Sequence, residues 1–127
     1  MAHRSQLAGF IIDCRTDDLD EAAAFWSQAL GMKAETDPDP EESAYRRLKN
    51  HPGDVHVEVQ AVEHESRVHI DIETDDLEAE VRRLETLGAR RMEMIERWWV
   101  MEAPGGHVFC VVPIQSDDFP ADANQWE

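Results

Sequence analysis

The sequence has few basic residues and no long apolar segment. Only 12 Lys and Arg residues stand against 28 Asp and Glu residues, so the formal net charge is −16 at pH 7. A surface this acidic repels phosphate backbones and anionic lipids, which argues against nucleic-acid and membrane partners. No apolar run approaches the roughly 20 residues that a membrane-spanning helix needs. The first residues lack the apolar stretch of a signal peptide, so a cytoplasmic protein is expected.

Cysteine is also scarce, with Cys14 and Cys110 as the two examples. They form no CxxC pair, and both lie in apolar runs, so we expect reduced thiols rather than a disulfide framework. The length of 127 residues is enough to bury a core, and we expect a single domain spanning residues 1–127.

An internal repeat is the main feature that the sequence does contain. The tetrapeptide TDDL occurs at Thr16–Leu19 and again at Thr74–Leu77. The match extends backward, where Ile12-Asp13-Cys14 aligns with Ile70-Asp71-Ile72, and forward, where Leu30-Gly31 aligns with Leu87-Gly88 after a slip of one residue. We therefore predict repeat 1 at about 7–62, repeat 2 at about 67–114, and a C-terminal tail at 115–127.

Each repeat predicts a strand, then a helix, then three short strands. The first strands are expected at Leu7–Cys14 and Arg67–Glu73, where apolar and β-branched residues are frequent. Asp17 and Asp75 are candidate N-caps for the helices, and Gly31 and Gly88 are candidate C-caps. The later strands are expected at about 32–36, 44–49 and 54–62, then at 89–95, 98–102 and 107–113, with an exposed acidic loop at 36–42 between two of them.

These elements predict an α+β fold made of two tandem βαβββ modules, in which curved mixed sheets surround a central cleft. A helix would cover one face of each sheet, and the opposite face would line the cleft. Alternation along the strands assigns the two faces. Val68, Ile70 and Ile72 should face the second helix, whereas Phe10, Ile12 and Cys14 should face the first.

The residues that alternate with these apolar ones along the strands should point away from the helices, and most of them are polar. Alternation selects His69, Asp71 and Glu73 in the first strand of repeat 2. In repeat 1 it selects His56, Glu58, Gln60 and Asp13. A solvated sheet face and a ligand pocket would both give this alternation. Trp98 and Trp99 are adjacent, so one indole should lie on each face, one of them in the core.

Several segments together resemble glyoxalase-like domains of the vicinal oxygen chelate (glyoxalase/bleomycin resistance/dioxygenase) superfamily. They are Asp13-Cys14, Ala24-Phe25-Trp26 with Leu30-Gly31, Gln60-Ala61-Val62, Arg67-Val68-His69-Ile70-Asp71, Leu87-Gly88-Ala89-Arg90, and Pro104 with Phe109-Cys110-Val111-Val112. The resemblance implies paired βαβββ modules around a cleft, usually in a homodimer. It favours the ligand pocket over the solvated face.

The resemblance also implies where a divalent metal would bind. In metal-bearing relatives the ligands come from corresponding places on the first, fourth, fifth and eighth strands. Here His69 matches the fifth-strand place and Glu58 or Gln60 the fourth, whereas Ile11 and Cys110 occupy the other two. His69 and Glu58 are therefore the candidate ligands for zinc, nickel, iron or manganese. The candidate ligand-binding residues are His69, Asp71, Glu58, Gln60, His56, Asp13 and Cys110.

Two functions remain open at this point. The first is a small-molecule-binding protein with a polar cleft. The second is a metal-dependent lyase, isomerase or dioxygenase of the same superfamily, in which a carboxylate would act as general base. The sequence names neither the ligand nor the substrate, because fold and family do not fix the reaction.

Overall fold

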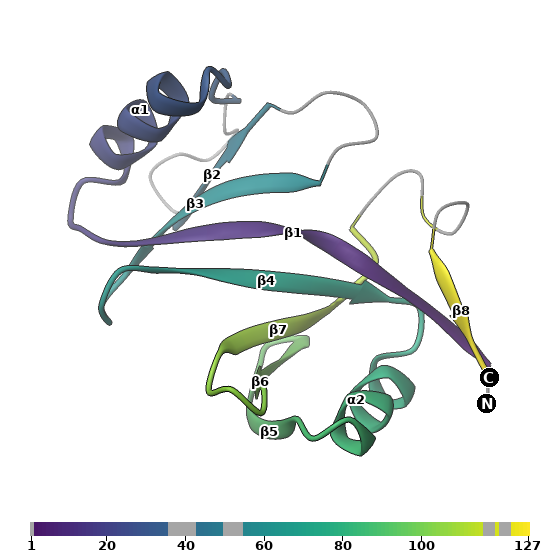
Figure 1. Ribbon diagram of the computed structural model, residues 1–127. Coiled ribbons are helices and arrows are strands. Elements are labelled where there is room, and N and C mark those ends of the chain that lie inside the picture. The colour runs from purple at the N-terminus through teal and green to yellow at the C-terminus, as the bar shows by residue number, and fades with distance from the viewer. Residues whose placement is uncertain (1, 36–42, 50–54, 116–118, 120–122) are drawn as a thin grey trace. The chain divides into compact units, whose positions relative to one another are not determined.

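The computed structural model describes residues 2–35, 43–49, 55–115, 119 and 123–127 (Figure 1). The chain forms two compact units, one of residues 9–68 and one of residues 1–8 with 69–127. The acidic loop expected at 36–42 lies outside the described residues. Among the residues that are described, no helix is long and apolar enough to cross a membrane.

The elements follow one another in an order close to the one expected. They are β1 (His3–Arg15), α1 (Leu19–Leu30), β2 (Tyr45–Leu48), β3 (His56–Val62), β4 (Arg67–Thr74), α2 (Leu77–Thr86), β5 (Arg90–Ile95), β6 (Trp98–Glu102), β7 (Val108–Pro113) and β8 (Asn124–Trp126). The prediction of an α+β fold with mixed sheets is confirmed, and the order β4-α2-β5-β6-β7 is consistent with a βαβββ module.

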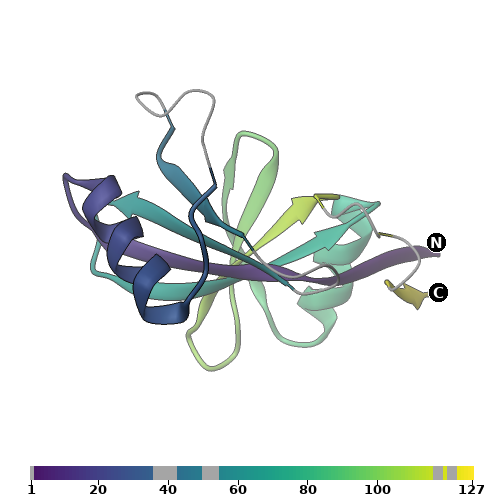
Figure 2. The ribbon, with the colours of Figure 1, turned by 90° about the horizontal axis from the view of Figure 1, so that it is seen from above.

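The unit of residues 9–68 contains the strand order β2-β3-β1. Strand β1 pairs with β3 in parallel, and β2 pairs with β3 antiparallel. Helix α1 packs against β2 and β3 (Figure 2). Its buried core consists of Ala23, Leu48 and Val59, with Trp26 and Cys14 among the residues packed around it. The strand expected at about 32–36 is wrong: it is reduced to a single bridge between Ala34 and Leu48.

The other unit contains the strand order β4-β7-β6-β5. Strands β4 and β7 are parallel, whereas β6 is antiparallel to both of its neighbours. Helix α2 packs over β7 and β5. The core is formed by Val81, Leu84, Met101 and Val111, and Ile72, Leu77, Ala89, Trp99 and Phe109 pack against it. Hydrophobic burial of this kind fixes the helix on one face of the sheet and leaves the opposite face for other contacts.

The repeated TDDL segments form the same helix start twice. The side chains of Asp18 and Asp76 accept hydrogen bonds from the N–H groups of Glu21 and Ala79, each at 3.1 Å. The expected N-caps Asp17 and Asp75 are therefore wrong by one residue. The threonine explains the shift, because its hydroxyl accepts from the N–H of the second aspartate in each copy, at 3.0 and 3.1 Å, and fixes that residue at the cap.

The helix ends differ between the two repeats. Gly31 caps α1 with a φ of 68°, a left-handed conformation that glycine adopts without steric cost, as predicted. Helix α2 instead has Leu87 as its C-cap, with helical backbone angles, so the expected cap at Gly88 is wrong by one residue. Gly88 follows with a φ of 109°.

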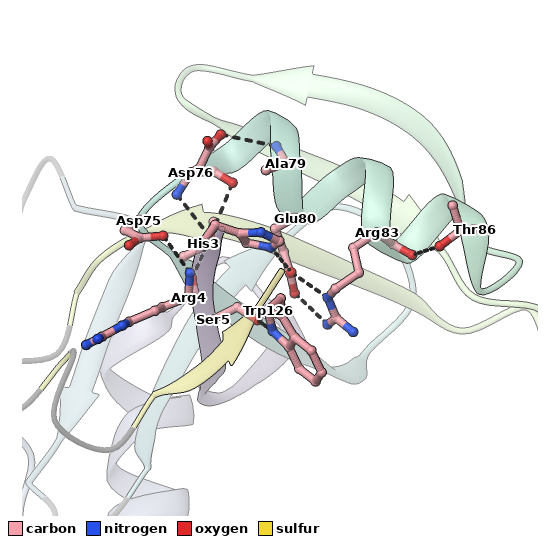
Figure 3. A network of polar contacts seen from close by, with 11 residues as sticks. His3, Arg4, Ser5, Asp75, Asp76, Ala79, Glu80, Arg83, Thr86 and Trp126 are labelled. Atoms are coloured by element: carbon pink, nitrogen blue, oxygen red, sulfur yellow. Dashed lines mark hydrogen bonds and ion pairs between the residues drawn. The ribbon is translucent and has the colours of Figure 1, made fainter. Parts of the chain in front are cut away.

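A network of polar contacts around a buried carboxylate fastens the start of β1 and the end of β8 to α2 (Figure 3). The fully buried Glu80 carboxylate lies 2.8 Å from Nε2 of His3 and accepts two hydrogen bonds from Arg83. The Arg83 guanidinium stacks on Trp126 at 3.9 Å, and the Trp126 indole donates to Ser5. Both termini of the chain are thus held against one helix.

Candidate functional site

The sheet face opposite α2 carries the first group of candidate residues. Ile72 packs toward α2, so the neighbouring His69, Asp71 and Glu73 point to the other side of β4. The prediction for this strand was partly wrong, since Val68 and Ile70 are 58% and 42% exposed instead of covered by a helix. Helix α2 packs over β7 and β5, and this leaves the start of β4 uncovered.

His69, Asp71 and Cys110 form a compact cluster on this face. One ligand atom from each of the three lies within 4.8 Å of the others. Asp71 and Cys110 are directly paired on the parallel strands β4 and β7. The side chains of His69 and Asp71 are each 12% exposed, with Nε2 of His69 3.4 Å from Oδ1 of Asp71. The structure thus brings together three of the predicted ligand-binding residues.

The donor set of this cluster fits a divalent metal ion. Imidazole, carboxylate and thiolate are all zinc ligands, and thiolate favours zinc over manganese. Oδ1 of Asp71 is buried and has no hydrogen-bond partner among the described residues. Its contact with Nε2 of His69, at 3.4 Å, is longer than a hydrogen bond, and a bound cation would satisfy the buried oxygen.

Glu73, next on the same face, has a different environment. It is fully buried, and its carboxylate accepts hydrogen bonds from Nε2 of Gln6 at 3.1 Å and from the N–H of Gln115 at 2.8 Å. These bonds tie β4 to the segments before and after it in the same unit. Glu73 therefore has a structural role.

The unit of residues 9–68 gathers the remaining predicted residues. His56, Glu58 and Gln60 alternate along β3 with Val57 and Val59, which face α1 as predicted. In the register of β1 with β3, Ile11 lies opposite Glu58 and Asp13 lies opposite Gln60. The carboxylate of Asp13, 2% exposed as a residue, lies 3.6 Å from Nε of Arg67. Phe10 was expected to face α1, but it is 36% exposed because α1 packs over β2 and β3.

Strand β2 adds two residues to this polar face that the sequence reasoning missed. Arg47 pairs with Glu58 and Tyr45 with Gln60 across the antiparallel strands. Nη2 of Arg47 lies 3.4 Å from Nε2 of His56, and its Nε lies 3.8 Å from Glu58. Nε2 of Gln60 donates to the Tyr45 hydroxyl at 3.0 Å.

The sequence contains a pattern that predicts where Tyr45 and Arg47 lie. In the segment Tyr45-Arg46-Arg47-Leu48, Leu48 is a core residue, so alternation places Tyr45 and Arg47 on the other face. Glu58, the predicted metal partner of His69, belongs to this unit and lies beside Arg47. Its pairing with His69 through an ion stays a prediction.

Comparison with known proteins supports one family. A family model described as a glyoxalase-like domain matches residues 9–112. A search of curated proteins found no match.

Solved structures of the same fold include methylmalonyl-CoA epimerase from Mycobacterium tuberculosis, with 20% identity and a TM-score of 0.57 over 87% of this chain and 88% of that one. A variant of the Streptomyces coelicolor methylmalonyl-CoA epimerase, in complex with 2-nitronate-propionyl-CoA, has 18% identity and a TM-score of 0.55, covering 87% and 95% of the two chains. A glyoxalase/bleomycin resistance protein/dioxygenase superfamily member from Vibrio splendidus has 17% identity and a TM-score of 0.53, covering 86% and 100%. At these identities the likeness shows the fold alone.

Proposed function

Because the chain belongs to the glyoxalase-like domain family, we propose that it binds a small molecule at the cluster of His69, Asp71 and Cys110. The cluster is the observation that carries the proposal. Three side chains of ligand type converge there within 4.8 Å on the sheet face that no helix of their unit covers among the described residues. A face that served only for packing would give no reason for a buried carboxylate oxygen without a hydrogen bond.

The cluster would hold a divalent cation, with zinc the best match to its donors. When bound, such an ion supplies Lewis-acid polarisation of oxygen atoms on the ligand. The residues themselves would have distinct roles. His69 would offer Nε2, Cys110 its thiolate, and Asp71 would offer Oδ1. The small molecule would then present two neighbouring oxygens, the chemistry that the superfamily shares.

A metal-dependent isomerase or lyase is the second candidate function. Three protein ligands favour it, because catalytic metal sites leave a coordination position open for substrate whereas structural zinc sites usually fill all four with protein. Two of the similar structures are methylmalonyl-CoA epimerases, which suggests a carbon acid beside a thioester as the first substrate to try. Exchange of its α-proton in D2O would be measured. Exchange catalysed by the wild type and lost in His69→Ala would favour the enzyme over the binder.

The thiol of Cys110 also indicates the cellular compartment of the protein. A thiolate ligand must stay reduced, and both Cys14 and Cys110 are free thiols. A reducing compartment keeps them so, and a cytoplasmic protein is therefore part of the proposal.

The test of the proposed function is zinc binding by His69→Ala. Competition with a chromophoric chelator would give the dissociation constant of the wild type and of the variant. We expect stoichiometric zinc binding by the wild type and a loss of at least about tenfold in affinity in the variant. His64→Ala is the matched control, since His64 is exposed and hydrogen-bonds the carbonyl of its neighbour Glu65. Equal zinc affinity in all three proteins would refute the metal site.

A further inference from the structure

The apolar side of the candidate site is on β6, the strand next but one to β4. Its two adjacent tryptophans have opposite roles. Trp99 packs against the core cluster under α2, with the Arg91 guanidinium 5.1 Å from its ring. Alternation then puts Trp98 and Val100 on the opposite face, the one that carries His69, Asp71 and Cys110. One of the two indoles is in the core, as the sequence predicted, and the other is on the candidate ligand-binding face.

The strand registers place this apolar surface next to the cluster. Asp71 is paired with Cys110, Cys110 with Val100, and Val100 with Glu93, so these four side chains form one row across the sheet. Neighbouring strands are about 4.8 Å apart, so Val100 directly adjoins the thiol. Trp98 lies two residues further along β6, which is about 6.7 Å, in the row that includes Ile95.

Trp98 and Val100 are only partly buried. Trp99 is also partly buried, but its indole packs against the core cluster under α2. A half-buried indole beside an isoleucine, a valine and a cluster of polar ligands instead offers a flat apolar surface for stacking.

We infer that Trp98 and Val100 form an apolar wall that selects ligands in which two neighbouring oxygens are attached to a flat hydrocarbon group. The oxygens would be held at His69, Asp71 and Cys110, while the ring or branched chain would lie on the indole. The ligand class is thus an aryl- or alkenyl-substituted hydroxy-carbonyl compound rather than a small hydrophilic acid. This inference rests on the proposed function, because the wall matters only if the cluster holds the oxygens.

Two hydroxamates test the wall directly. Acetohydroxamate and benzohydroxamate share the same pair of neighbouring oxygens and differ in a methyl against a phenyl group. Calorimetric titration of the zinc-loaded protein would give both dissociation constants. We expect benzohydroxamate to bind about tenfold more tightly than acetohydroxamate, since a phenyl group buries more apolar surface than a methyl group and stacks on the indole.

Replacing Trp98 should remove this preference and leave the oxygen site intact. In Trp98→Ala we expect the ratio of the two affinities to fall to about threefold or less, because benzohydroxamate loses its stacking contact whereas acetohydroxamate has no ring to lose. Trp98→Leu keeps more of the apolar volume and serves if the alanine variant folds poorly, as judged by its melting temperature. Leu87→Ala is the control, because Leu87 is 65% exposed at the end of α2 and is not on β6.

The outcomes separate the two proposals. If neither hydroxamate binds the zinc-loaded protein, the proposed function fails and the wall with it. If both bind the wild type with equal affinity, or Trp98→Ala keeps the full preference, the oxygen site stands and the wall is refuted. Quenching of Trp98 fluorescence by benzohydroxamate in a variant with the other three tryptophans replaced by phenylalanine would support stacking independently of affinity.

Discussion

Asp71 and Cys110 lie opposite each other on the parallel strands β4 and β7, and the imidazole of His69 lies 3.4 Å from the same carboxylate. The pairing joins two residues that are far apart in the chain. In the sequence, Cys110 appeared as a departure from the ligand pattern of the family. In the fold it lies beside the one buried carboxylate oxygen of the cluster that has no hydrogen bond within the described residues.

Cys110→Ser tests this relationship. We expect zinc affinity to fall by at least about tenfold, because an alcohol is a far weaker zinc ligand than a thiolate. Loading with Co2+ gives a second measurement, since a cobalt–thiolate bond produces a charge-transfer absorption band that the serine variant should lack. Cys14→Ser, which changes the other cysteine, is the control and should keep the band. A wild-type cobalt complex without the band would exclude Cys110 as a ligand.

The Glu80 ion pair gives a prediction on pH. Burial by itself raises the pKa of Glu80, but hydrogen bonds from Arg83, His3 and Ser5 outweigh it, so the net pKa is lowered. The unfolded chain has a glutamate pKa of about 4.3. The stabilisation is therefore complete above that pH and is lost as the pH falls through the lower folded value.

We expect Glu80→Gln to lower the free energy of unfolding by about 2 kcal/mol at pH 7, since it removes the charge from a buried pair. The difference from the wild type should shrink steadily below about pH 4. Urea denaturation at several pH values would measure it. A difference that stayed constant from pH 7 to pH 3 would mean that the charge of Glu80 contributes nothing.

Gly9 marks a close approach between β1 and β3. A Cβ at this position would lie 2.3 Å from the carbonyl oxygen of His56, and that atom belongs to the backbone of the paired strand. We expect Gly9→Ala to destabilise the protein by about 3 kcal/mol, because the strands must move apart to relieve the clash. At Gly105 the nearest atom would be 3.6 Å away, an ordinary contact, so Gly105→Ala should be nearly neutral. Thermal melts of both variants would decide whether the approach is as close as described.

Trp26 and Phe25 are adjacent on α1 and should differ in their effect on stability. Trp26 packs against the core of Ala23, Leu48 and Val59, whereas Phe25 is 61% exposed. Trp26→Ala should cost about 3 kcal/mol through the cavity that it leaves, and Phe25→Ala less than about 1 kcal/mol. Chemical denaturation would compare them. Similar losses in both variants would show that the helix presents a different face to the sheet.

We also propose that the protein is a homodimer. Strand β5 ends the order β4-β7-β6-β5, and no strand among the described residues pairs with its outer side. Met92, Met94 and Ile95 on this strand are exposed, and open apolar edges are usually paired or covered. Sedimentation velocity at micromolar concentrations should give twice the mass of the chain. A monomer across that range would contradict the proposal.

The helix caps show how far local sequence predicts local structure. Both TDDL segments form a capped helix start, as the repeat predicted, because the threonine hydroxyl and the second aspartate accept hydrogen bonds from nearby backbone N–H groups. The cap itself is the second aspartate and not the first. That detail depends on the threonine hydroxyl, which accepts from the N–H of the second aspartate and so fixes that residue at the cap.

The two faces of the sheets were predictable only in part. Alternation correctly directed Ile72, Val57 and Val59 toward the helices, since a strand has two faces and a period of two. It failed for Phe10, Val68 and Ile70, which are exposed. Alternation tells on which face of the sheet a side chain lies. Whether the helix covers that part of the face depends on how the helix packs.

The sequence by itself determined the family, the repeated order of strands and helices, and the parity that puts His69 and Asp71 on one face. These features are local: they depend on residue type and spacing along a few consecutive positions. The tertiary structure alone decided that Cys110 lies beside Asp71, that Trp98 shares their face, and that Arg47 and Tyr45 face Glu58 and Gln60. Those contacts depend on strand register between distant segments, and register follows from the packing of the whole sheet.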